Sequence, residues 1–257
     1  MLDIKRIKEK NEAVKRLVRH SAIVGMVLQL ILMFFLSGCT ASEKDSVQSA
    51  REGGIFFKST EDFRDHIDLL VDPAAYTGTE KGYIATLYTY TRKDHVLEDP
   101  GTLRLKLEDG TYYDCPFTLG ELTADGWNAD YHTSQEYPTF PATFTKNGGG
   151  FRANMKTGHD ASAAIAFGYD ILTPYYYTKT KTKVPVMSFS IELPEKSAVI
   201  HSQDSMKNVI ETIGLPDVIE YTESRTVQFT YKFQAYSILF RFDAEKDWME
   251  WVDVNYK

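Results

Sequence analysis

The two cysteines offer the most reactive side chains in the chain, and they lie in different settings. Cys39 follows the uncharged run "AIVGMVLQLILMFFL" after only two small residues, whereas Cys115 ends the alternating segment "TYYDC". A thiol acts as a nucleophile when it is ionised and as a small hydrophobe when it is buried. Cys115 has no second cysteine to pair with if Cys39 is modified. We therefore expect Cys115 to be buried, with a reactive or intermolecular thiol as the alternative.

The segment before Cys39 has the three parts of an export signal. Residues 1–20 hold seven Lys or Arg against three Asp or Glu, residues 22–36 carry no charge, and Ser37 and Gly38 are small. Fifteen helical residues span about 22 Å, less than the roughly 30 Å hydrocarbon core of a bilayer. This favours a signal peptide that comprises residues 1–38, and the alternatives are an uncleaved anchor and ordinary secretion. The basic head is unusually long, so translation could start downstream of Met1.

The end of this signal, "LSGC" at Leu36–Cys39, resembles the lipobox of bacterial lipoproteins. The resemblance implies that diacylglycerol alkylates the Cys39 thiol, that a peptidase cleaves before it, and that the freed amine often takes a third chain. Each buried methylene contributes about 0.8 kcal/mol, so two or three chains anchor a protein stably. We expect a protein anchored to the cell membrane through Cys39 and facing outside the cytoplasm, with this covalent lipid in place of a cofactor.

Removal of residues 1–38 takes seven basic and three acidic residues from totals of 29 and 36 and leaves a net charge of about −11. Such a chain repels nucleic acids and anionic headgroups, which argues against nucleic-acid binding. Residues 39–54 are polar, lack aromatic residues and show no periodicity. They are typical of a flexible tether.

The remaining polar residues form no recognisable catalytic motif. The five histidines beyond the signal are scattered without an HExxH pattern, and no serine lies in a GxSxG elbow. "NGGG" at 147–150 lacks the Lys-Ser/Thr of a phosphate loop and indicates a hairpin turn instead. We predict no catalytic, cofactor-binding or metal-binding residues. A hydrolase assembled from distant residues is the alternative.

The elements of residues 55–184 indicate an N-terminal α+β region. A capped amphipathic helix begins near Ser59 and is stopped by Pro73. Asp109-Gly110 between two alternating runs is a strong hairpin signal, and residues 147–150 mark a second hairpin. Between them, residues 118–127 predict a short helix closed by Gly126.

Residues 171–184 join alternating Thr and Lys to a tyrosine triplet. The alternation predicts an exposed edge strand, on which lysines discourage unwanted pairing. The functional alternative is an aromatic and basic contact patch, for which Tyr175, Tyr176 and Tyr177 are the candidate residues.

Residues 185–257 predict a strand, a helix and three further strands. The helix has Ser202 or Asp204 as its cap and ends at Gly214. On the last strand, residues 248–256, neither alternating face is cleanly apolar, so the pattern does not identify the buried face.

The C-terminal "SMKNVIETIGLPD" and the strands after it resemble lipoprotein modules of the SmpA/OmlA (BamE-like) type and the repeat of beta-lactamase inhibitory protein. "DGTYYDCPFTLGELTADGW" is similar to a phrase in uncharacterised lipoproteins of gut Firmicutes. These resemblances imply an α+β fold with short helices packed on antiparallel sheets, which presents a sheet or concave face to another protein. A helix followed by strands occurs around 118–172 and again around 202–256, so two tandem helix-plus-meander modules are an option. Oligomeric state stays open.

Together these features favour a non-enzymatic protein-interaction module at the cell envelope, with a protein as its partner. The alternative is a small-ligand or glycan-binding lipoprotein that stacks sugars on the ring faces of Tyr175–Tyr177.

The anchoring hypothesis depends on the thiol of Cys39. We expect Cys39→Ala to accumulate as an unprocessed precursor that incorporates no labelled palmitate, because a methyl group cannot form the thioether. Cys115→Ala is the matched control and should label like the wild type. Unchanged palmitate labelling of Cys39→Ala would refute the assignment.

Overall fold

The computed structural model describes residues 56–80, 86–132, 138–156, 164–181 and 186–257. All of these belong to one compact unit, Gly53–Lys257. The predicted signal, Cys39 and the tether lie outside the described residues. Within the described part of the chain, no helix is long and apolar enough to cross a membrane.

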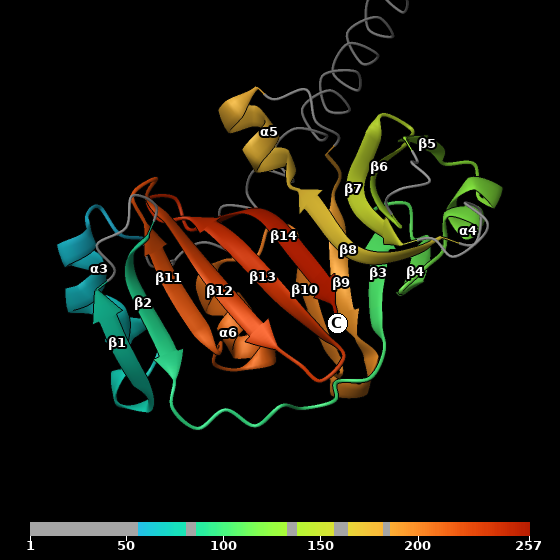
Figure 1. Cartoon of the computed structure of the whole chain (residues 1–257). Coiled ribbons are helices and arrows are strands. Elements are labelled where there is room, and N and C mark those ends of the chain that lie inside the picture. The colour runs from blue at the N-terminus through green and yellow to red at the C-terminus, as the bar shows by residue number, and fades with distance from the viewer. Residues whose placement is uncertain (1–55, 81–85, 133–137, 157–163, 182–185) are drawn as a thin grey trace, which may run out of the picture. The chain divides into compact units, whose positions relative to one another are not determined.

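Two antiparallel sheets dominate this unit (Figure 1). The larger has ten strands in the order β1-β2-β11-β12-β13-β14-β8-β7-β6-β5, and the smaller has four in the order β10-β9-β3-β4. The strands are β1 Tyr76–Glu80, β2 Thr86–Arg92, β3 Leu103–Leu107, β4 Tyr112–Cys115, β5 Asn128–Tyr131, β6 Thr139–Lys146, β7 Gly149–Lys156, β8 Ile165–Leu172, β9 Phe189–Leu193, β10 Ala198–His201, β11 Val218–Thr222, β12 Thr226–Lys232, β13 Tyr236–Asp243 and β14 Trp248–Tyr256. The expected mixed fold with antiparallel sheets is confirmed, with strands far more prominent than helices.

The helices are short and begin at capping residues. They are α3 Thr60–His66, η1 Ile67–Leu69, η2 Pro73–Ala75, α4 Leu119–Ala124, α5 Pro174–Thr180, η4 Pro194–Lys196 and α6 Met206–Ile213. Thr118 and Glu121 form a reciprocal capping box at α4. Ser205, rather than Ser202 or Asp204, caps α6, because its hydroxyl accepts from the Asn208 amide at 3.1 Å. Gly214 ends α6 with a φ of 89°, as expected.

The same order of elements occurs twice along the chain. A hairpin, a helix and a four-stranded meander run from β3 to β8 and again from β9 to β14. The first strands of the hairpins pair with each other (β3 with β9), and so do the last strands of the meanders (β8 with β14). The regions predicted on either side of the boundary at residues 184 and 185 therefore share both sheets. We refer to residues 103–172 and 189–256 as the first and second runs.

The predicted edge strand within residues 171–184 is wrong for the residues that the structure describes. Thr173 accepts a hydrogen bond from the Tyr176 amide at 3.3 Å, and Pro174 occupies the first helical position, so the segment forms α5. Proline has no amide to leave unpaired there and its fixed φ suits a helix start. This local signal outweighs the Thr-Lys alternation.

A β-bulge explains why the last strand shows no clean apolar face. Arg241 is opposite Trp251 and Phe242 is opposite Met249, so Glu250 is the extra residue. The insertion shifts the alternation by one, and Met249 and Val252 both become buried on the core side. A strict period of two fails at this point.

The core lies between the two sheets and under α3, α4 and α6. It is rich in aromatic side chains and includes Phe63 of α3, Ile67 of η1, and Leu70 and Val71 just after them. The helix predicted from Ser59 to Pro73 thus ends at His66 and continues as a 3-10 turn. Cys115 is also buried, as predicted, and burial raises the pKa of its thiol to about 12.

Truncating side chains on the two faces of β12 should change the free energy of unfolding by different amounts. Phe229 is fully buried between Ile219 and Phe240 on neighbouring strands, whereas Gln228 faces outward. We expect Phe229→Ala to lower the free energy of unfolding by about 3–5 kcal/mol through lost burial and a residual cavity. Gln228→Ala should change it by less than about 0.5 kcal/mol. Urea unfolding measures both, and equal effects would contradict the assigned faces.

Candidate functional site

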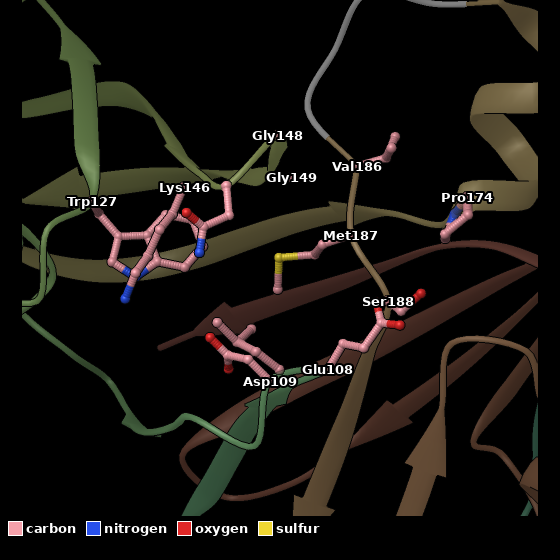
Figure 2. A pocket seen from close by; sticks show the side chains of 12 residues that line it. Glu108, Asp109, Trp127, Lys146, Gly148, Gly149, Pro174, Val186, Met187 and Ser188 are labelled. Atoms are coloured by element: carbon pink, nitrogen blue, oxygen red, sulfur yellow. The ribbon is translucent and has the colours of Figure 1, made fainter.

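A cleft of about 490 Å³ opens where the segment between the two runs passes the turns of the first run (Figure 2). The β3–β4 turn contributes Glu108 and Asp109, and the β6–β7 turn contributes residues 146–149. Pro174 of α5 and residues 186–188 complete the wall. The volume is in the range of ligand-binding pockets in proteins.

Trp127 forms the floor of the cleft and is held on several sides. Its indole Nε1 donates to the Tyr113 hydroxyl at 2.9 Å, and its ring meets Phe151 edge-on at 5.3 Å. Lys146 Nζ lies 5.9 Å from the centroid of the Trp127 ring, a cation–π distance. Because the indole is only 5% exposed, it belongs mainly to the core and presents little surface to the cleft.

The opposite wall is apolar and approaches the β6–β7 turn closely. Gly150 N donates to Val186 O at 3.2 Å. A Cβ on Gly149 would lie 3.0 Å from the same oxygen, so a larger residue would displace this wall. Met187 projects its flexible thioether into the space (Figure 2).

Charges of both signs surround the apolar wall. Asp109 accepts a hydrogen bond from the Thr111 amide at 2.9 Å, and this bond, with the charge of Lys146, holds the pKa of Asp109 below its usual value. Glu108 and Asp109 are exposed, and Lys146 is close enough for its charge to act on Asp109. The cleft can therefore hold a group with an apolar part and polar or charged ends.

The lining of the cleft in the described structure combines carboxylates, one ammonium group and one hydroxyl. Ser188 is the one hydroxyl among the side chains that line the cleft in the described structure, and no histidine or cysteine accompanies it there. A serine nucleophile needs an adjacent base within hydrogen-bond reach. Two of the lining turns were predicted from the sequence, but their meeting depends on tertiary structure.

The three candidate tyrosines do not form one surface patch. Tyr175 packs against Trp248 with tilted rings whose centroids are 4.7 Å apart, and its hydroxyl donates to Asp243 Oδ2 at 2.7 Å. Tyr176 meets Trp251 edge-on at 5.3 Å. Tyr177 is 46% exposed. Two of the rings thus fasten α5 to β14, and of the three only Tyr177 is largely exposed.

An ionic network that the sequence analysis missed completes the attachment of α5. Lys179 Nζ lies 2.6 Å from Asp243 Oδ2 and 2.7 Å from Glu250 Oε1, and Arg241 Nε donates to Glu250 Oε2 at 3.0 Å. Burial alone would raise the pKa of Asp243, but hydrogen bonds from Lys179 and Tyr175 outweigh it and lower that pKa. The bulge shifts the strand alternation and directs the Glu250 side chain to this network. A periodic reading of the sequence therefore does not reveal the network.

The outward face of the large sheet carries a second polar cluster. A row of side chains runs across six strands: Thr230, Leu239, Asp253, Asp170, Arg152 and Thr143. Asp253 and Asp170 are directly opposite each other where the two runs join. Burial, followed by the charge of Asp170, raises the pKa of Asp253 to about 6.

The described histidines and carboxylates do not converge on a metal-sized point. No group of three or more His, Cys, Asp or Glu in the described ranges could hold a metal ion. His66 pairs with Asp62 and His95 with Asp217, in separate parts of the fold. His159 lies outside the described residues.

Comparison with known proteins gave no matching family model, no matching curated protein and no matching solved structure. The resemblances to bacterial lipoproteins and to BamE-like modules therefore stay predictions from the sequence. Functional inference depends on the geometry of the cleft and the sheet face.

The carboxylate pair predicts a specific pH dependence. The folded state holds the Asp253 proton more tightly than the unfolded chain, so this residue contributes stability below pH about 4, which is lost as the pH rises through about 6. Asp253→Asn removes the ionisation and the repulsion of Asp170. We expect it to raise the free energy of unfolding at pH 7 relative to wild type and to flatten its change between pH 7 and pH 4.

Denaturant unfolding across this pH range measures the effect. Asp68→Asn, at an exposed position of η1, is the control and should keep the wild-type slope. A steeper decline between pH 4 and 7 in Asp253→Asn than in wild type would contradict the prediction.

Proposed function

We propose that this protein is a lipid-anchored lipoprotein on the outer side of the cell membrane that acts as a non-enzymatic protein-interaction module. The basic head, the uncharged run and "LSGC" support the anchor on Cys39. The acidic mature chain supports a soluble body held near the membrane by lipid and tether.

The open outer face of the large sheet is the observation that carries the interaction role. Figure 1 views this face, with α6 behind the sheet and α5 over one end of it. Its side chains alternate with the buried core residues, and half-buried Leu239 and Trp251 lie among polar neighbours. Arg241 stacks on Trp251 at 3.9 Å and keeps that ring in place. Aromatic and arginine anchors within a polar surround are typical of protein interfaces.

Pairing of β8 with β14 makes this face continuous across both runs. Its middle carries the carboxylates of Asp170 and Asp253, with Arg152 beside them. Such a rigid surface, fixed by backbone pairing, orders few groups on binding, which lowers the entropic cost of association.

The cleft favours a second candidate, a small-ligand or glycan-binding lipoprotein. Its volume and its combination of apolar wall and charged rim suit a ligand of modest size. Since Tyr175 and Tyr176 pack against tryptophans, we move the candidate sugar site from these rings to the cleft beside Lys146.

Site-specific crosslinking in intact cells tests the interaction role. A photoreactive residue at Asn154 or Asn255 on the open face should capture one recurring protein, because both side chains are exposed there. The same residue at Tyr112, exposed on the smaller sheet, is the matched control and should not capture it. Equal capture from all three positions would count against the open face.

The protein-binding candidate depends on the open sheet face, whereas the ligand-binding candidate depends on the cleft beside Lys146. If captures are absent at Asn154 and Asn255 while Lys146→Ala abolishes binding to a glycan array, the ligand-binding candidate replaces the protein-binding one. If the Lys146→Ala protein still gives the crosslinks from Asn154 and Asn255, the result would support the open sheet face as the binding surface.

A further inference from the structure

The centre of the open sheet face carries two carboxylates that face each other. Asp170 of β8 and Asp253 of β14 are opposite each other in the register where the two runs join, and both side chains are half-buried. No hydrogen bond or ion pair between described residues engages either carboxylate. The charge of Arg152, on the next strand, acts on Asp170. Two carboxylates and one guanidinium leave a net charge of −1 at this place.

This facing pair lowers the stability of the sheet. Like charges directly opposite each other on neighbouring strands repel. Burial and the charge of Asp170 raise the pKa of Asp253 to about 6, so at neutral pH Asp253 is mostly ionised despite the repulsion. Local conflicts of this kind are expected at functional sites, where a ligand can supply the missing charge.

The same face already binds a lysine between two other carboxylates. Asp243 of β13 and Glu250 of β14 also extend from neighbouring strands, and Lys179 Nζ lies 2.6 Å from the first carboxylate and 2.7 Å from the second. Lys179 belongs to α5, whose Tyr176 meets Trp251 edge-on at 5.3 Å. The helix α5 is thus an internal example of a segment that docks on this face through a lysine and an aromatic ring.

Apolar and amide side chains surround the central pair. Half-buried Leu239 is directly opposite Asp253 on β13. In the next row, the side-chain amides of Asn154 and Asn255 lie over Gly168, because a Cβ on this glycine would be 3.5 Å from Asn154 Nδ2 and 3.1 Å from Asn255 Oδ1. The pair therefore has an apolar contact beside it and amide groups that can share in hydrogen bonding.

We propose that the partner of the open face is a basic protein segment that places a lysine ammonium between Asp170 and Asp253. This inference rests on the proposed interaction role and names the chemistry of the partner. An ammonium brings one positive charge and three donors, which balances the net charge of the centre and serves both carboxylates. The methylene stem of the lysine can pack on Leu239. Such charge complementarity selects the partner and speeds association.

Titration of the full mature chain with a capped trilysine peptide at low, constant ionic strength, followed by heteronuclear NMR, tests the contact. Amide shifts of residues 168–171 and 252–255 should saturate, and the same peptide with acetylated side chains should leave them unchanged, because acetylation removes the charge. Asp170→Asn and Asp253→Asn should each weaken binding about fivefold. Asp68→Asn, the same charge change at an exposed position of η1, is the matched control and should bind as wild type.

Crosslinking in intact cells separates this inference from the interaction role. A photoreactive residue at Asn154 should capture its partner less efficiently when Asp170→Asn and Asp253→Asn are combined. Undiminished capture, unsaturated shifts in wild type, or equal peptide binding by both single variants and Asp68→Asn in folded samples would overturn the inference. Saturating peptide shifts with no protein captured in wild type would instead overturn the interaction role and support the lysine contact.

Discussion

Antiparallel pairing between the two runs is the constraint on which the rest of this structure depends. Backbone hydrogen bonds between β8 and β14 turn two four-stranded meanders into one sheet, and β3 with β9 joins the two hairpins into another. Each central strand then has a partner on both sides, so the exposed edges move to the periphery. Side chains at the junction share a fixed register, with Ile171 opposite Val252 toward the core and Asp170 opposite Asp253 toward the outside.

The bulge at Glu250 converts this regular surface into an anchoring point for the segment between the runs. The extra residue directs a buried carboxylate to the outer side, where Lys179 and Arg241 pair with it. A buried carboxylate needs such partners, because an uncompensated charge in this environment is strongly unfavourable. The pairing holds α5 on β14, and α5 in turn places Pro174 at the cleft. The second run thus shapes a site whose lining comes mostly from the first.

Local signals predicted much of the fold. The hairpin at Asp109-Gly110, the helix closed by Gly126 and the helix stopped at Gly214 follow from turn and capping chemistry over a few residues. The prediction failed at α5, where Thr173 and Pro174 outweighed the alternation after them. It also could not choose a buried face for β14, because the bulge breaks the period. The cleft and the ionic network join residues more than sixty positions apart, such as Lys179 and Asp243, and no local pattern encodes such contacts.

The distribution of charge distinguishes the surfaces that these contacts create. On the sheet face, the facing carboxylates of Asp170 and Asp253 are offset by one neighbouring arginine, so negative charge prevails at its centre. A smaller hollow beside residues 93–98 is lined by residues of both signs, and its carboxylates already have partners: Asp217 accepts from the Lys232 amide and Glu98 pairs with Lys196. Exposed charges further apart than about 10 Å are largely screened at physiological salt, so each region acts on its own surroundings. The charge at the centre of the sheet face therefore acts on groups close to it, independently of the charges around the hollow.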